Sequence, residues 1–85
     1  MASYRLLIKP SAAKVLEGLP LKDRGRIVKR IHGLSAEPRP AGLEKLSGQD
    51  KLRVRQGNYR ILYLIDDSLQ TATIVKIGHR RDDYR

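Results

Sequence analysis

A tight hairpin in the second half of this 85-residue chain constrains its fold more than any other feature. Apolar and polar residues alternate over Leu52–Gln56, and a second run rich in strand-forming residues covers Tyr59–Ile65. This period of two is typical of β-strands. The two residues between the runs, Gly57–Asn58, are typical of a two-residue β-turn. The pattern therefore predicts an antiparallel hairpin with a tight turn.

The predicted turn also determines which side chains share a face of the hairpin, because directly opposed residues lie on the same side of a sheet. With two turn residues, Arg55 faces Arg60 and Val54 faces Ile61. One face is then mainly basic, and it consists of Lys51, Arg53, Arg55, Arg60, Leu62 and Leu64. The other face is apolar and suited to pack on helices, and it consists of Leu52, Val54, Ile61, Tyr63 and Ile65.

The basic face has two possible interpretations. Opposed like charges destabilise a sheet by a few tenths of a kcal/mol to about 1 kcal/mol, so the face is unfavourable unless an anion binds there. Guanidinium groups stay protonated and match phosphate with two parallel hydrogen bonds. The face is therefore either a phosphate-binding site or a solvated basic strand surface.

The other segments predict an α+β domain. Apolar residues recur with helical spacing in two stretches that follow a short strand-forming run. The expected elements are a strand over Tyr4–Ile8, a helix from Pro10 that ends at Gly18, a helix over Leu21–Ser35, the hairpin, a turn at Asp66–Ser68 and a strand over Thr71–Ile77. This β-α-α-β-β-β order predicts a three-stranded antiparallel meander with the helices on one face of the sheet. The chain is too short for two cores, so residues 1–85 form one domain.

Charge and composition narrow the function. Eighteen Lys and Arg against nine Asp and Glu give a net charge of +9, which attracts polyanions and makes nucleic acid the first partner to consider. The chain has no Cys and two His, too few for a closed metal site, so we expect no metal and no cofactor. The apolar run Leu6–Ile8 is far too short for a signal peptide or a membrane span. We expect a cytoplasmic protein without a membrane partner.

The last eight residues, Gly78–Arg85, combine an imidazole, guanidinium groups and an aromatic ring. His79 can exchange a proton near neutral pH. Arg80 or Arg81 can bind phosphate, and Tyr84 can stack on a base, as aromatic side chains do with single-stranded RNA. The alternative is a charged chain terminus without a specific role.

Three segments resemble, in their order and spacing, the RelE branch of the RelE/ParE superfamily of toxin–antitoxin toxins: Lys45–Gly48, Leu52–Tyr63 and Ile77–Arg85. The first strand and the helical hairpin also match, so the resemblance covers nearly the whole chain. It implies a ribosome-dependent endoribonuclease that cuts mRNA in the ribosomal A site and inhibits translation. It further implies attack of the ribose 2′-hydroxyl on the adjacent phosphate, a cognate RelB-type antitoxin, and DNA binding through that antitoxin.

The resemblance also implies roles for particular residues. Arg53 and Arg55 match the basic pair of the strand before the hairpin, and Arg60 matches the arginine after the hairpin tyrosine. Arg80 and Tyr84 match the C-terminal arginine and tyrosine. The expected catalytic residues are Arg53, Arg60, Arg80, Tyr84 and Lys51, and the expected further RNA contacts are Arg55, His79 and Arg81.

The general base stays open at this point, because guanidinium groups are poor proton acceptors. If the hairpin were two residues longer, Lys51 and Arg53 would become the matching pair, and Lys51 could be the base. Otherwise the base is His79, or the reaction proceeds by positioning and charge stabilisation alone.

Two other functions compete with this interpretation. The first is a ParE-like inhibitor of DNA gyrase without nuclease activity, a branch that typically lacks the full basic set with Tyr84. The second is a small basic nucleic-acid-binding module. A helix-turn-helix regulator normally lies in a helical bundle, whereas half of this chain has the pattern of strands.

Overall fold

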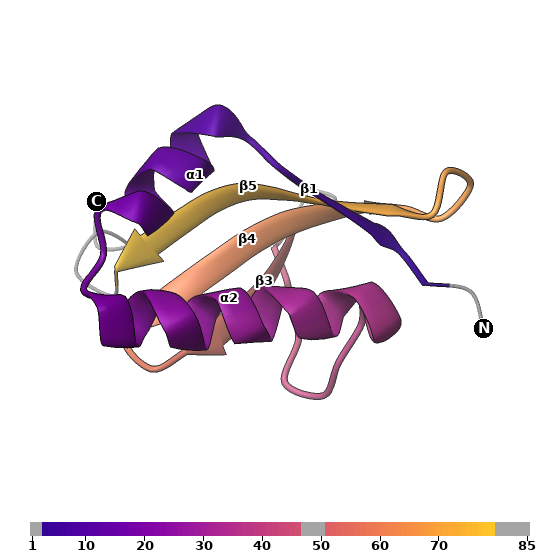
Figure 1. Ribbon diagram of the computed structural model, residues 1–85. Coiled ribbons are helices and arrows are strands. Elements are labelled where there is room, and N and C mark those ends of the chain that lie inside the picture. Colours follow the sequence, from indigo (N-terminus) through magenta and orange to yellow (C-terminus); the bar gives the residue numbers. More distant parts are fainter. Residues whose placement is uncertain (1–2, 47–50, 80–85) are drawn as a thin grey trace.

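The computed structural model describes residues 3–46 and 51–79, which form a mixed five-stranded sheet with two helices packed against it (Figure 1). The elements in chain order are β1 (Arg5–Ile8), α1 (Pro10–Glu17), α2 (Leu21–Ala36), β2 (Glu44–Lys45), β3 (Leu52–Gln56), β4 (Tyr59–Asp66) and β5 (Thr71–His79). The predicted α+β class is confirmed. None of the helices in these residues is long and apolar enough to cross a membrane.

The hairpin forms in the predicted register. Arg55 pairs with Arg60, and Val54 pairs with Ile61. Gly57 has a φ of 61°, the left-handed value that the first position of a type II′ turn requires and that glycine adopts without a steric penalty. A hairpin two residues longer is not formed.

The sheet contains more than the predicted meander. Its strand order is β1-β5-β4-β3-β2, with β1 parallel to β5 and the other neighbours antiparallel. The two helices lie in the connection from β1, at one edge of the sheet, to β2, at the other edge, and the meander then returns across the sheet until β5 lies beside β1. Strand β2 was not predicted, because it has only two residues and no alternation can be recognised over so short a length. A bulge at Val75 shifts the register of β5, since Leu62 pairs with Lys76 and Tyr63 pairs with Ile74.

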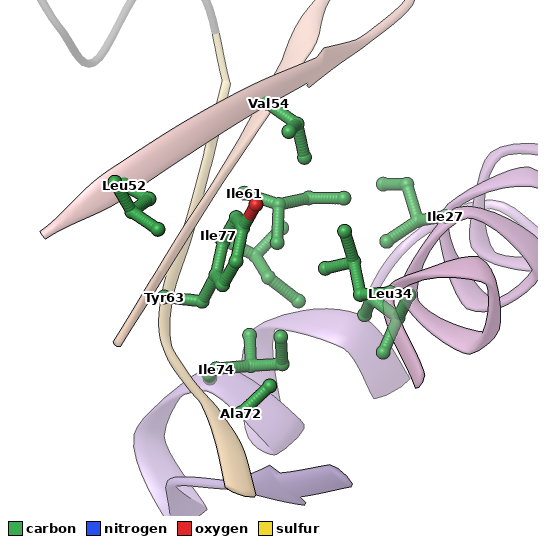
Figure 2. Packing of buried hydrophobic residues seen from close by; sticks show 11 residues of the cluster. Ile27, Leu34, Leu52, Val54, Ile61, Tyr63, Ala72, Ile74 and Ile77 are labelled. Atoms are coloured by element: carbon green, nitrogen blue, oxygen red, sulfur yellow. The ribbon is translucent and has the colours of Figure 1, made fainter. Parts of the chain in front are cut away.

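The apolar face of the hairpin is the buried one, as predicted (Figure 2). Val54, Ile61 and Tyr63 have no exposed surface, and Ile27 and Leu34 of α2 reach towards them. Helix α1 contributes Ala12 to the same core and contacts β5. The helix boundaries follow from proline and glycine, since α1 begins at Pro10, ends before Gly18 and is followed by Pro20, the residue before α2.

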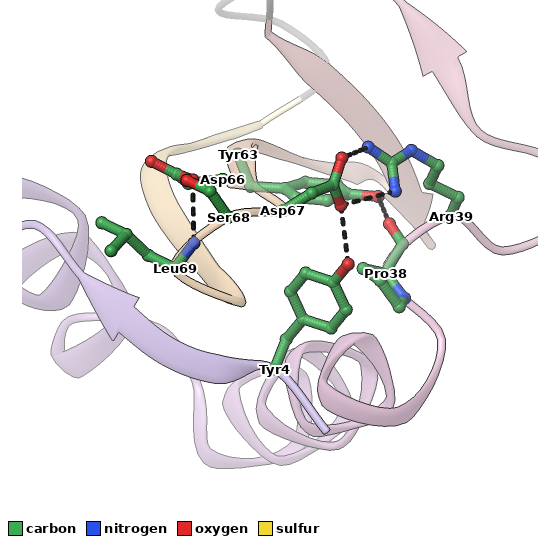
Figure 3. A network of polar contacts seen from close by, with 8 residues as sticks. All are labelled: Tyr4, Pro38, Arg39, Tyr63, Asp66, Asp67, Ser68 and Leu69. Carbon is green, nitrogen blue, oxygen red and sulfur yellow. Dashed lines mark hydrogen bonds and ion pairs between the residues drawn. The ribbon is translucent and has the colours of Figure 1, made fainter. Parts of the chain in front are cut away.

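A polar network closes the end of the sheet where β4 turns into β5 (Figure 3). Asp67 accepts two hydrogen bonds from the Arg39 guanidinium, at 2.9 and 3.1 Å, and one from the Tyr4 hydroxyl at 2.6 Å. The preceding carboxylate, Asp66, accepts hydrogen bonds from the Ser68 hydroxyl and the Leu69 amide. The predicted turn at Asp66–Ser68 is therefore present. It is tied both to the N-terminal segment and to the segment after α2.

Candidate nucleic-acid interface

The sheet surface opposite the core collects three arginines on two neighbouring strands. Arg55 of β3 and Arg60 of β4 are direct cross-strand partners, and Arg53 lies two residues before Arg55 on the same face. The Arg55 side chain is 60% exposed and that of Arg53 is 23% exposed, so the first projects into solvent and the second lies along the sheet. We call this surface, made of Arg53, Arg55 and Arg60, the arginine face. It joins three of the predicted site residues.

The arginine face also contains a carboxylate that the sequence interpretation missed. Glu44 of β2 pairs in register with Arg53, so the two side chains lie on the same side of the sheet. Its Oε1 atom lies 3.2 Å from both Nε and an Nη of Arg53 and 3.6 Å from Nε of Arg55. Partly exposed ion pairs of this kind contribute about 0.2–1 kcal/mol each. Glu44 therefore offsets part of the repulsion expected between the arginines.

No sequence pattern identifies Glu44 as part of this face. The residue follows a loop rich in proline and glycine, and the strand that carries it is two residues long. Its position depends on a pairing with β3 that only the folded sheet defines.

Lys51 lies on the same side of the sheet, beside an open groove of about 710 Å³. Leu62 and Leu64 of β4 line the groove, and Lys9 and Lys76 contribute two further ammonium groups. Lys76 is exposed and pairs with Leu62, which itself pairs with Arg53, so it extends the basic surface from β3 to β5. Strict alternation from Ala72 and Ile74 would put Lys76 on the buried side, so its outward position depends on the bulge at Val75 and was not predictable from the pattern of the strand.

His79 lies elsewhere. It pairs in register with Tyr59, whereas Arg60 pairs with Gly78, so the imidazole and the arginine face belong to opposite sides of the sheet. The rings of His79 and Tyr59 form an edge contact, with 5.2 Å between centroids and an interplanar angle of 88°. The Tyr59 hydroxyl donates a hydrogen bond of 3.0 Å to Asp23 of α2, and this bond, together with desolvation, raises the pKa of Tyr59. The structure thus brings the His79 ring together with that of Tyr59, on the side of the sheet opposite the arginine face.

Three predicted site residues, Arg80, Arg81 and Tyr84, lie outside the described residues. Within residues 3–46 and 51–79, no group of three or more His, Cys, Asp and Glu side chains could hold a metal ion. The guanidinium groups of the arginine face and the ammonium groups beside the groove are suited to bind an anion.

Comparison with known sequences gives one family and two relatives. Residues 6–84 match the ParE toxin family of type II toxin–antitoxin systems, parDE. Toxin RelG of Mycobacterium tuberculosis is 35% identical over 86 residues, which cover 96% of this chain and 97% of that protein. Toxin RelE of the same organism is 32% identical over 84 residues, which cover 96% of this chain and 87% of that protein.

Solved structures give a consistent result. The archaeal RelE–RelB complex from Pyrococcus horikoshii OT3 contains a chain that matches with a TM-score of 0.82 and 30% identity, covering 91% of this chain and 94% of that one. The RelBE2 toxin–antitoxin complex from Mycobacterium tuberculosis matches with a TM-score of 0.83 and 29% identity, covering 93% of this chain and all of that one, at 100%. The resemblance therefore extends from individual segments to the whole described fold.

Proposed function

The chain belongs to the RelE/ParE family as a RelE-type toxin of a type II toxin–antitoxin system, and we propose that it is a ribosome-dependent mRNA endoribonuclease. In this proposal the toxin cuts mRNA in the ribosomal A site and so inhibits translation. The observation that carries the proposal is the arginine face, because Arg53, Arg55 and Arg60 share one side of the sheet that the core does not need. Such a surface suits a phosphate backbone.

The proposed reaction is an internal transfer at one phosphate of the message. The 2′-hydroxyl oxygen forms a bond to phosphorus while the bond from phosphorus to the 5′-oxygen breaks, which leaves a 2′,3′-cyclic phosphate and a 5′-hydroxyl. The hydroxyl proton goes to a base, and the leaving oxygen takes a proton from an acid. Guanidinium groups supply hydrogen bonds to the extra negative charge of the phosphorane. Arg53 and Arg60 fit this task, and family resemblance adds Arg80 and Tyr84.

We propose Lys51 rather than His79 as the base. Lys51 lies on the same side of the sheet as the arginines, whereas His79 is paired with Tyr59 on the other side. With a two-residue turn, Arg53 and Arg55 remain the residues that match the basic pair of the family. The proposal that Lys51 is the base therefore rests on the face that it shares with the arginines, and not on a longer hairpin. The groove beside Lys51 is open to solvent, which is consistent with a substrate that the ribosome must position.

The proposed partner is a RelB-type antitoxin. The similar archaeal and mycobacterial structures are RelE–RelB and RelBE2 complexes. The net charge of +9 suits an antitoxin with an acidic or amphipathic segment that competes for the basic surface. DNA binding by the complex would then come through the antitoxin. We also propose that the toxin acts in the cytoplasm, where translating ribosomes lie.

Primer extension on a defined mRNA in purified translating ribosomes tests the proposal. We expect new stops in A-site codons with the wild-type toxin, and a loss of about 10²–10³ in cleavage rate with Arg53→Ala, the size expected when a group that stabilises transition-state charge is removed. Arg26→Ala is the matched control, because it removes an equally charged, exposed side chain from α2. Lys51→Ala should abolish cleavage while RNA binding is retained.

Inhibition of DNA gyrase is the second candidate function, favoured by the ParE description of the matching family. The discriminating result is simple. Intact mRNA on translating ribosomes, together with stalled gyrase–DNA complexes in a parallel assay, would replace the nuclease proposal by gyrase inhibition.

A further inference from the structure

The arginine face already holds an anion of its own in the protein without RNA. Glu44 Oε1 lies 3.2 Å from Nε and from one Nη of Arg53, and 3.6 Å from Nε of Arg55. We propose that Glu44 is an internal competitor of the RNA phosphate, which a backbone phosphate displaces when it binds to Arg53 and Arg55. The inference rests on the proposed RNA-directed function and names a residue that regulates the same site.

The contacted atoms are the reason for expecting competition. Nε and the neighbouring Nη form the edge of a guanidinium group that bonds a phosphate or a carboxylate with two parallel hydrogen bonds. Glu44 occupies this edge of Arg53, so a phosphate cannot use the same two donors until the carboxylate leaves. A phosphodiester and a carboxylate each carry one negative charge. A phosphate that arrived beside a retained Glu44 would also meet a like charge.

The position of Glu44 makes displacement possible without unfolding. Its side chain is 42% exposed, and the strand that carries it has two residues at the edge of the sheet. A rotation of the side chain into solvent would leave the arginines in place, because Arg53 and Arg55 belong to β3, which is paired on both sides. The carboxylate can therefore exchange with a ligand while the backbone that carries Arg53 and Arg55 stays in place.

The substitution Glu44→Gln tests the proposal, since it keeps the size of the side chain and removes its charge. We expect the antitoxin-free toxin to bind a fluorescently labelled single-stranded RNA about three- to tenfold more tightly after this change, the range that the loss of one or two partly exposed ion pairs allows. The riboses of the probe carry 2′-O-methyl groups, so that it is not cleaved during the anisotropy measurement. Thermal unfolding of each variant checks that the fold is retained.

Two controls separate local competition from a change in net charge. Glu17→Gln gives the same gain of one positive charge on an exposed residue of α1 and should change affinity less than twofold. In an Arg53→Ala, Arg55→Ala background, Glu44→Gln should have no larger effect than Glu17→Gln. Equal gains from Glu44→Gln and Glu17→Gln would overturn the proposal, because net charge alone would then explain the affinity.

The binding assay tests the competitor role of Glu44, and the ribosome assay tests the nuclease proposal, so each proposal can be refuted without the other. Unchanged or weaker RNA binding by Glu44→Gln, with wild-type toxin that still cuts mRNA on ribosomes, would overturn the competitor role and leave the proposed function intact. Tighter binding by Glu44→Gln, with mRNA left intact by both proteins, would support the competitor role and refute the nuclease. Lost cleavage with unchanged affinity would give the carboxylate a role in the reaction and would also overturn competition.

Discussion

Replacing Tyr63 with phenylalanine tests how the core-facing side of β4 is tied to the segment that follows α2. Tyr63 has no exposed surface, and its hydroxyl donates a hydrogen bond of 2.7 Å to the carbonyl oxygen of Pro38, which is also buried (Figure 3). Tyr63→Phe removes one oxygen and leaves the ring in the core. The carbonyl of Pro38 then loses its donor in a place that water does not reach.

The expected loss of stability follows from that single hydrogen bond. A neutral hydrogen bond contributes about 0.5–1.5 kcal/mol net, and a buried acceptor left without a donor costs about 1–3 kcal/mol. We therefore expect Tyr63→Phe to lower the free energy of unfolding by about 1–2 kcal/mol. For a domain of this size the midpoint of thermal unfolding should fall by about 4–8 °C per kcal/mol. Urea unfolding measures the free energy, with the slope m unchanged if the fold is retained.

The same pair of proteins gives a second, pH-dependent test. Desolvation by burial raises the pKa of Tyr63 from 10.0 to about 12, so the folded state keeps its proton at a pH where the unfolded state has lost it. Stability then falls as pH rises between these two values, because the folded protein binds more protons than the unfolded chain. The advantage of wild type over Tyr63→Phe should shrink over this range. An advantage that is absent at pH 7, or that grows above pH 10, would refute the reasoning.

The remaining predictions concern the turn network, the arginine face and the hairpin. Hydrogen bonds from Arg39 and then from Tyr4 hold the pKa of Asp67 below 3.8, so wild type should be more stable than Asp67→Asn at pH 7. Urea unfolding should show that this advantage vanishes as the pH falls below 3.8 through the folded-state pKa. Arg53→Ala should make the plot of log binding constant against log salt for single-stranded RNA shallower, by about 0.7 for each phosphate that the guanidinium neutralises. Gly57→Ala should destabilise the protein by about 1 kcal/mol in thermal unfolding, because alanine is strained at a φ of 61°.

The fold was predictable where local chemistry agrees with the final pairing. The turn residues Gly57–Asn58 determine the hairpin register, and that register assigns Val54 to the core and Arg55 to solvent without knowledge of any other element. The pairing of β1 with β5 was not predictable in the same way. It joins segments from opposite ends of the chain, and nothing in the Tyr4–Ile8 run specifies a parallel neighbour.

The same distinction, between what local patterns predict and what only the folded pairing defines, applies to the candidate site. Arg53, Arg55 and Arg60 were found because strand alternation and one turn determine their common face. Glu44 was missed because its two-residue strand has no period of its own. That His79 contacts RNA stays a prediction. The side of the sheet on which His79 lies follows only from the pairing of β4 with β5.

Strands β3 and β4 carry apolar core residues on one side and the arginine face on the other. Alternation requires that each apolar residue turned towards α2 is followed by one turned away from it, so burial of the core residues of β3 and β4 leaves the choice of the outer residues open. The outer positions carry cations, and Arg55 and Arg60 repel each other because they are direct cross-strand partners. Glu44 of the edge strand β2 places one negative charge beside Arg53 and Arg55. A ligand phosphate that takes the place of Glu44 relieves the same repulsion. Binding would then exchange one counter-charge for another, and the affinity of the toxin for RNA would depend on how readily a single carboxylate leaves.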